Sequence, residues 1–117
     1  MNDKCIFTLN GVGMSISYGW EKLYLAVDCL TSEGEQTGRL IDAVSFNLAQ
    51  ITSENDLPEN LKHRFDNLME SFRAVQPKQD EGLFRATINS FNQMERKAAI
   101  EEIISLYTEV CKHRELT

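Results

Sequence analysis

The stretch SYGWEKLYLAVDCL, residues 17–30, contains the only Trp of the chain and two of its three Tyr residues. Its apolar residues repeat at the spacing of an α-helix, which is predicted from about Tyr18 to Thr31, with Ser17 as its N-cap. One apolar stripe of this helix is expected to face the core of the protein. The stripe consists of Trp20, Leu23, Tyr24, Val27 and Leu30.

A second apolar cluster lies on the reverse side of the same helix and consists of Tyr18, Leu25 and Cys29. Glu21 and Asp28 separate the two stripes on one flank, and Lys22 with Ala26 separates them on the other. A helix with two apolar sides lies either in the middle of a fold or at an interface. The reverse stripe is therefore covered by residues 5–9 of the same chain, by a second copy of the chain, or by another protein. The exposure of Leu25 is the observation that bears on this choice.

Three more helices are expected downstream, because each segment carries an apolar stripe between recognisable boundaries. Asp56 with Glu59, and Asn92 with Glu95, have the spacing of helix-capping pairs. Residues 83–91 fit either a short helix or an extended lead-in. The helices are expected from Glu35 or Arg39 to Thr52, from the Asp56 cap to about Val75, and from about Gln93 to Arg114.

These elements predict an all-α fold, an antiparallel four-helix bundle, in a single domain over residues 1–117. The short helix at 83–91 would be a fifth. Residues 5–16 have strand character around Asn10 and Gly11, so they are expected to form an extended arm or a small β-hairpin.

The composition is that of a soluble globular protein, with 117 residues, 42% hydrophobic and 26% charged. No apolar run is long enough to cross a bilayer, and the first residues lack the pattern of a signal peptide. Three cysteines without paired spacing argue against a disulfide framework. We therefore expect a cytoplasmic location.

The net charge of −6 lies entirely in the first half of the chain. Residues 1–60 contain nine acidic and three basic residues, a balance of −6, whereas residues 61–117 contain nine of each. Negative charge repels phosphate backbones, so nucleic acid is not an expected partner. A basic protein surface is a better complement, although such acids also serve solubility.

Motifs for chemistry are absent from the sequence. There is no CxxC pair, no HExxH and no ExxH pair, so no metal site is expected. There is also no GxSxG elbow, P-loop or dinucleotide fingerprint, and no cofactor is predicted. We therefore expect a protein that is not an enzyme; an active site built without a known motif is the least favoured alternative.

The hypothesis that remains is a small acidic protein that acts by binding another, basic protein. An immunity-type or antitoxin-type inhibitor, or an adaptor, would have this size and charge. The residues expected to bind the partner are Tyr18, Glu21, Leu25 and Asp28. The alternative is a structural homodimer that pairs through the reverse stripe and has no distinct partner surface.

Overall fold

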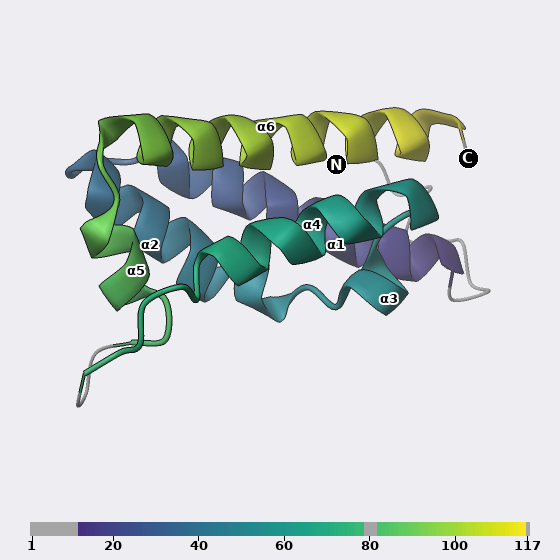
Figure 1. Ribbon diagram of the computed structural model, residues 1–117. Helices are drawn as coiled ribbons and strands as arrows, with labels where there is room; N and C mark the ends of the chain where they lie inside the picture. Colours follow the sequence, from purple (N-terminus) through teal and green to yellow (C-terminus); the bar gives the residue numbers. More distant parts are fainter. Residues whose placement is uncertain (1–11, 79–81, 117) are drawn as a thin grey trace.

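The computed structural model describes residues 12–78 and 82–116 of the chain, and all regular structure in these ranges is helical (Figure 1). The all-α prediction is thereby confirmed. None of the described helices is both long enough and apolar enough to span a membrane. The elements are α1 (Val12–Leu30), α2 (Gln36–Phe46), the 3-10 turn η2 (Leu48–Gln50), α3 (Ser53–Asp56), α4 (Glu59–Ser71), α5 (Arg85–Ser90) and α6 (Gln93–Leu116).

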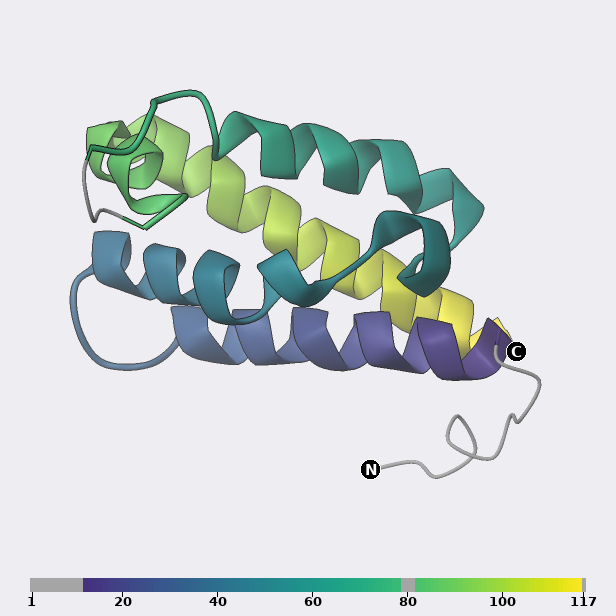
Figure 2. The same ribbon diagram turned by 90° about the horizontal axis from the view of Figure 1, so that it is seen from below.

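The longest helix, α6, runs along the length of the molecule and packs against α1, α2 and α4. Helices α1 and α2 are antiparallel neighbours joined by a short loop, and α4 lies on the other side of the fold from α1 (Figure 2). The turn η2 and helix α3 lead from α2 back across α1 before α4 begins. The apolar stripes of all four long helices thus face one common core.

The four-helix bundle is not confirmed in the form predicted, because the second expected helix ends early. It was expected to reach Thr52 but stops at Phe46, because the backbone of the next residue, Asn47, is outside the helical region. The Asn47 side chain is buried, and its Nδ2 donates to Sγ of Cys29 on α1 at 3.3 Å. Because a buried amide needs a partner, this contact holds Asn47 against α1 at the break.

Two of the predicted helix caps are wrong and one is confirmed. Asp56 does not cap α4; its Oδ2 accepts a hydrogen bond from the backbone N–H of Thr52 at 2.8 Å and closes α3 instead. Ser17 lies inside α1, which begins at Val12. Asn92 and Glu95 each accept a hydrogen bond from the other's backbone N–H, both at 2.8 Å, which is the reciprocal capping box expected.

The predicted arm or hairpin at residues 5–16 falls mostly outside the described residues. Its last part, 12–16, belongs to α1 and is helical. The short-helix alternative for 83–91 is correct, since α5 forms there. The buried Thr87 of α5 anchors the preceding loop, because its Oγ1 accepts from the N–H of Val75 at 2.9 Å and lies 3.3 Å from the Val75 carbonyl oxygen.

The core takes side chains from every long helix, and one polar link joins α4 to α6. Nε and Nη2 of Arg64 donate to the two carboxylate oxygens of Glu102 at 3.0 and 2.9 Å, and Nη2 also donates to Oγ of Ser105 at 2.8 Å. The hydrogen bonds to Glu102 raise the pKa of Arg64 above its ordinary value. The largest fully buried apolar side chains are Phe72, Leu23, Leu40, Leu48, Leu61, Ile88, Ile103 and Leu106.

Candidate functional site

The buried face of α1 includes part of the predicted core stripe and the residues between that stripe and the reverse stripe. Leu23 and Leu30 of the core stripe are buried, and so are Gly19 and Ala26 beside them; Leu23 and Ala26 are completely buried. Ala26 was predicted to separate the two stripes, and it is part of the buried face instead. A Cβ atom at Gly19 would overlap the backbone carbonyl oxygen of Asp56, so α3 packs directly on the α1 backbone. Small residues therefore bring the neighbouring elements close to this face.

The prediction that Tyr24 belongs to the core is wrong, because its side chain is 46% exposed. The ring stacks on that of Trp20, with centroids 5.6 Å apart and an angle of 12° between the planes. Tyr107 of α6 lies on the same two rings, at centroid distances of 6.4 Å from Trp20 and 6.2 Å from Tyr24. Tyr24 thus sits on the rim of an aromatic cluster rather than beneath it.

This aromatic cluster closes the seam between α1 and α6. Nε1 of Trp20 lies 3.3 Å from Sγ of Cys111, and the guanidinium of Arg114 stands 4.1 Å from the centroid of the Trp20 ring. Such a cation over an aromatic face is favourable by about 0.5–2 kcal/mol. Burial raises the pKa of Tyr107, and its hydrogen bond with Cys111 acts in the same direction.

The reverse stripe is only partly covered, and α2 with η2 supplies the described cover. Cys29 is half-buried under Asn47, and Leu25 is half-buried as well. Tyr18 is 38% exposed; its hydroxyl lies 3.5 Å from Oε1 of Gln50, and the ammonium of Lys22 stands 5.3 Å from its ring centroid. Leu25 is therefore neither a core residue nor a freely exposed one.

The four residues predicted to bind a partner all reach the outer side of α1. Glu21 and Asp28 are exposed between the two tyrosines, and Leu25 borders them. We call this surface the outer face of α1; it consists of Tyr18, Glu21, Tyr24, Leu25 and Asp28. Sequence reasoning missed Tyr24, although its position at the edge of the predicted core stripe, next to Asp28 and Glu21, was a signal of its exposure.

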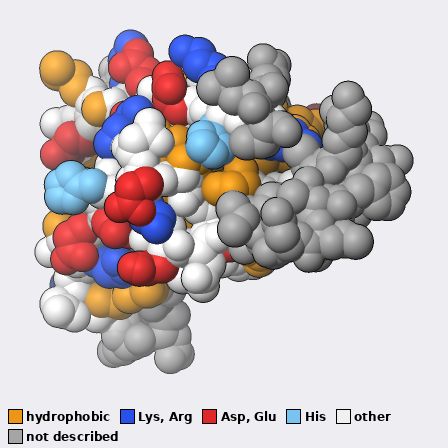
Figure 3. Space-filling model, turned by 90° about the vertical axis from the view of Figure 1, so that its right-hand side faces the viewer, with side chains coloured by type: hydrophobic (Ala, Val, Ile, Leu, Met, Phe, Trp, Pro, Cys, Tyr) orange, Lys and Arg blue, Asp and Glu red, His pale blue; other side chains and the backbone are white. Residues whose placement is uncertain are grey.

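The acids on the outer face of α1 take no part in the ion pairs of the described chain. Glu21 and Asp28, like Asp42 and Asp66, have no ion-pair partner among the described residues. The described ion pairs lie within α4, within α6, between these two helices, and between α4 and Arg73 just after its end. The end of the molecule seen in Figure 3 accordingly shows Lys and Arg side chains lying among Asp and Glu side chains. The pairs are Lys62–Glu59, Arg64–Glu102, Arg73–Glu70, Lys97–Glu101 and Lys112–Glu109.

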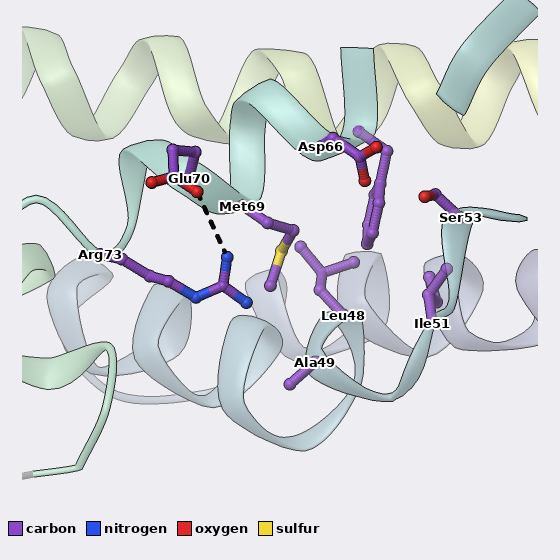
Figure 4. Close-up of a pocket in the computed structure, with 9 residues that line it drawn as sticks. Leu48, Ala49, Ile51, Ser53, Asp66, Met69, Glu70 and Arg73 are labelled. Carbon is purple, nitrogen blue, oxygen red and sulfur yellow. Dashed lines mark ion pairs between the residues drawn. The ribbon is translucent and has the colours of Figure 1, made fainter. Parts of the chain in front are cut away.

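A groove of about 230 Å³ lies between the η2–α3 segment and α4. Figure 4 shows Asp66 and Ser53 at one end of the groove and the ion pair of Arg73 with Glu70, at 3.8 Å, at the other. Neither His63 nor His113 lines the groove. The lining residues are Leu48, Ala49, Ile51, Ser53, Phe65, Asp66, Met69, Glu70 and Arg73.

Comparison with known proteins identifies no relative: no family model, no curated protein and no solved structure matches the chain. Among the described residues, no group of three or more His, Cys, Asp or Glu side chains is arranged to hold a metal ion. The candidate functional surfaces therefore rest on geometry and charge alone, and they are the outer face of α1 and the groove beside α4.

Proposed function

We propose that this protein acts by binding another protein through the outer face of α1. The observation that carries the proposal is the exposure of two aromatic side chains, Tyr24 at 46% and Tyr18 at 38%, on either side of two acids without an ion-pair partner among the described residues. Tyrosine is enriched in protein interfaces because it buries a large apolar ring and keeps a polar tip. The half-buried Leu25 adds apolar surface between them.

The charge of this face indicates a basic partner. Glu21 and Asp28 are exposed, and Lys22, which lies over the Tyr18 ring, is the one basic residue next to them on α1. Asp42 adds a further exposed acid on the neighbouring helix α2. Unpaired carboxylates at the rim of an interface attract a basic surface and speed the encounter more than they strengthen the final complex.

The mechanism would be steric occlusion, which requires no catalytic step from this chain. The tyrosines and Leu25 would anchor the partner, and Glu21 with Asp28 would steer it onto α1. An inhibitor of the immunity or antitoxin kind, or an adaptor, acts in this manner. The alternative is a homodimer formed through the same face, and an experiment must distinguish it from binding to a different protein.

Photocrosslinking tests the proposal in the cells that produce the protein. A photoreactive phenylalanine analogue replaces Tyr24, and a control carries it at the exposed Thr108 on the outer side of α6. The expected result is an adduct between this chain and a different protein that forms from position 24 and not from position 108. An adduct of two copies of this chain would replace the proposal with a homodimer. No adduct from position 24, or equal adducts from both positions, would overturn it.

A further inference from the structure

Phe46, the last residue of α2, has the most exposed aromatic side chain of the described residues, at 62%. It lies two helical turns after Arg39 and therefore on the same side of α2. That side borders α1, because Nη1 of Arg39 donates to the carbonyl oxygen of Leu30, the last residue of α1, at 2.7 Å. Phe46 thus stands at the seam between α1 and α2, which lie side by side (Figure 2).

The amide of Gln50 connects this seam to the reverse stripe of α1. Its Nε2 donates to the carbonyl oxygen of Phe46 at 2.7 Å, and its Oε1 lies 3.5 Å from the hydroxyl of Tyr18. The half-buried Leu25 comes seven residues after Tyr18 and lies on the same side of α1. The exposed apolar surface of α1 therefore continues onto α2. We call Tyr18, Leu25 and Phe46 together the α1–α2 apolar surface.

Exposed acids border the α1–α2 apolar surface. Glu21 and Asp28 lie on α1 and Asp42 lies on α2, and none of the three has an ion-pair partner among the described residues. A second copy of the chain would present the same three acids, so the charge favours a different, basic protein. The partner that fits this surface therefore combines apolar side chains with positive charge along one edge.

The spacing of the two acids on α1 favours a helical partner. Glu21 and Asp28 are seven residues apart, so they point the same way and are separated by about 10.5 Å along the helix axis. Two residues seven apart in a partner helix that lies along α1 have the same separation. In a strand, residues on one side follow one another at about 6.6 and 13 Å, which does not match. The described residues also form no sheet whose edge could accept a strand.

We infer that the partner docks as a single basic amphipathic α-helix that lies along α1. Its apolar stripe packs on the α1–α2 apolar surface, and two Lys or Arg residues seven positions apart meet Glu21 and Asp28. Tyr24 lies one turn from each of these acids, so its exposed ring is next to the same cations. The inference rests on the function proposed above, and it adds the structural class of the partner and Phe46 as an anchor.

Photocrosslinking from α2 tests where the partner lies. p-Benzoyl-phenylalanine replaces Phe46 in one variant and Ser45 in its control; both positions are exposed, but they point about 100° apart around the helix. The protein that crosslinks at position 24 is expected to crosslink at position 46 and not at position 45. Mass spectrometry identifies the segment that carries the adduct. That segment should have apolar residues at helical spacing and two basic residues seven positions apart.

A synthetic peptide of about 20 residues around the adduct then replaces the whole partner. Such a peptide is at most marginally helical alone, and circular dichroism should show that it gains helix when it binds the full chain. Phe46→Ala should weaken binding about tenfold, as expected for an anchor residue. Met94→Ala removes an apolar side chain that is 80% exposed on α6, and it should leave the affinity unchanged.

A charge swap tests the pairing of the acids with the peptide. Glu21→Lys with Asp28→Lys should weaken binding by about tenfold or more, and a peptide with Glu in place of its two basic residues should restore it. A peptide that binds without gaining helix, a swap that restores nothing, or an unchanged affinity of Phe46→Ala would each overturn the inference.

The crosslinking outcomes separate this inference from the function proposed above. An adduct from position 24 but not from position 46, or equal adducts from positions 45 and 46, would overturn the inference and leave the proposed function standing. A position 46 that crosslinks only to a second copy of the chain would overturn the inference as well. If neither position 24 nor position 46 gives an adduct, both proposals fall.

Discussion

Gly19 of α1 lies so close to the backbone carbonyl of Asp56, at the end of α3, that no side chain fits between them. This contact explains how a four-residue helix stays in place: α3 rests on the backbone of α1 and is closed by the hydrogen bond from Thr52 to Asp56. The position of η2 and α3, and with it one wall of the groove, depends on that close approach.

The variant Gly19→Ala should therefore destabilise the protein by about 1–3 kcal/mol, the usual cost of overpacking. Alanine in a helix interior is ordinarily better than glycine by up to about 1 kcal/mol. Gly38→Ala in α2 is the matched control, because a Cβ there meets no atom within 4 Å, and it should stabilise. Urea unfolding followed by circular dichroism measures both. A Gly19→Ala variant as stable as Gly38→Ala would contradict the packing described for α1 and α3.

The bidentate pair of Arg64 and Glu102 should contribute to the docking of α4 on α6. A double-mutant cycle with Arg64→Met and Glu102→Gln is expected to give a coupling of about 1 kcal/mol, because the charge-assisted bonds are bidentate but about one third exposed. The same cycle on Lys97 and Glu101, an exposed pair within α6, should give about 0.3–0.5 kcal/mol. Equal coupling energies in the two cycles would show that the Arg64–Glu102 pair stabilises the protein no more than an exposed pair within one helix does.

The Thr87 hydroxyl should hold the loop that follows α4. Thr87→Val keeps the shape of the side chain but leaves the N–H of Val75 without its partner, at an expected cost of about 1–3 kcal/mol. Thr87→Ser retains the hydroxyl and should cost less than half as much. Hydrogen exchange at the Val75 amide reports the same bond directly: exchange should accelerate in Thr87→Val and stay slow in Thr87→Ser.

Tyr107 should titrate above the ordinary tyrosine pKa of about 10, because burial favours its neutral form. Between the pKa of the unfolded chain and the raised pKa of the folded one, only the unfolded chain loses this proton. The free energy of unfolding should therefore fall as the pH rises through that range, and Tyr107→Phe should reduce the fall. Alkaline titration of tyrosinate absorbance provides the check. If Tyr107→Phe removes a component centred at or below 10, the raised pKa is wrong.

Much of the helical content was predictable because it depends on local patterns. The apolar period of α1, α2, α4 and α6 is read within each segment, and the Asn92–Glu95 capping box needs residues only three apart. The early end of α2 was not predictable, since it depends on the buried contact of Asn47 with Cys29 from another helix. The carboxylate of Asp56 can bond to the backbone of α3 or to that of α4. The packing of α3 against Gly19 favours the bond within α3.

The outer face of α1 could likewise be predicted from the sequence only in part. Periodicity placed Tyr18, Glu21 and Asp28 away from the centre of the core stripe, where the structure has them exposed. Periodicity predicted Tyr24 to be buried and did not predict the burial of Ala26. The reason is that a stripe defined by large apolar residues includes a tyrosine and leaves out an alanine. Which of the two is buried depends on how closely α2, α3 and α6 approach α1, and that distance is set by small residues whose neighbours the sequence does not reveal.

The central claim, that the outer face of α1 receives a basic partner, is tested most directly by association kinetics with the protein that crosslinks at position 24. Glu21→Lys with Asp28→Lys is compared with Glu59→Lys with Glu101→Lys, a double reversal of the same net charge on α4 and α6. The account predicts that the first pair slows association at low salt by about tenfold or more and flattens its salt dependence, while the second pair changes the rate by less than about twofold. Equal rates for the two double variants would contradict it.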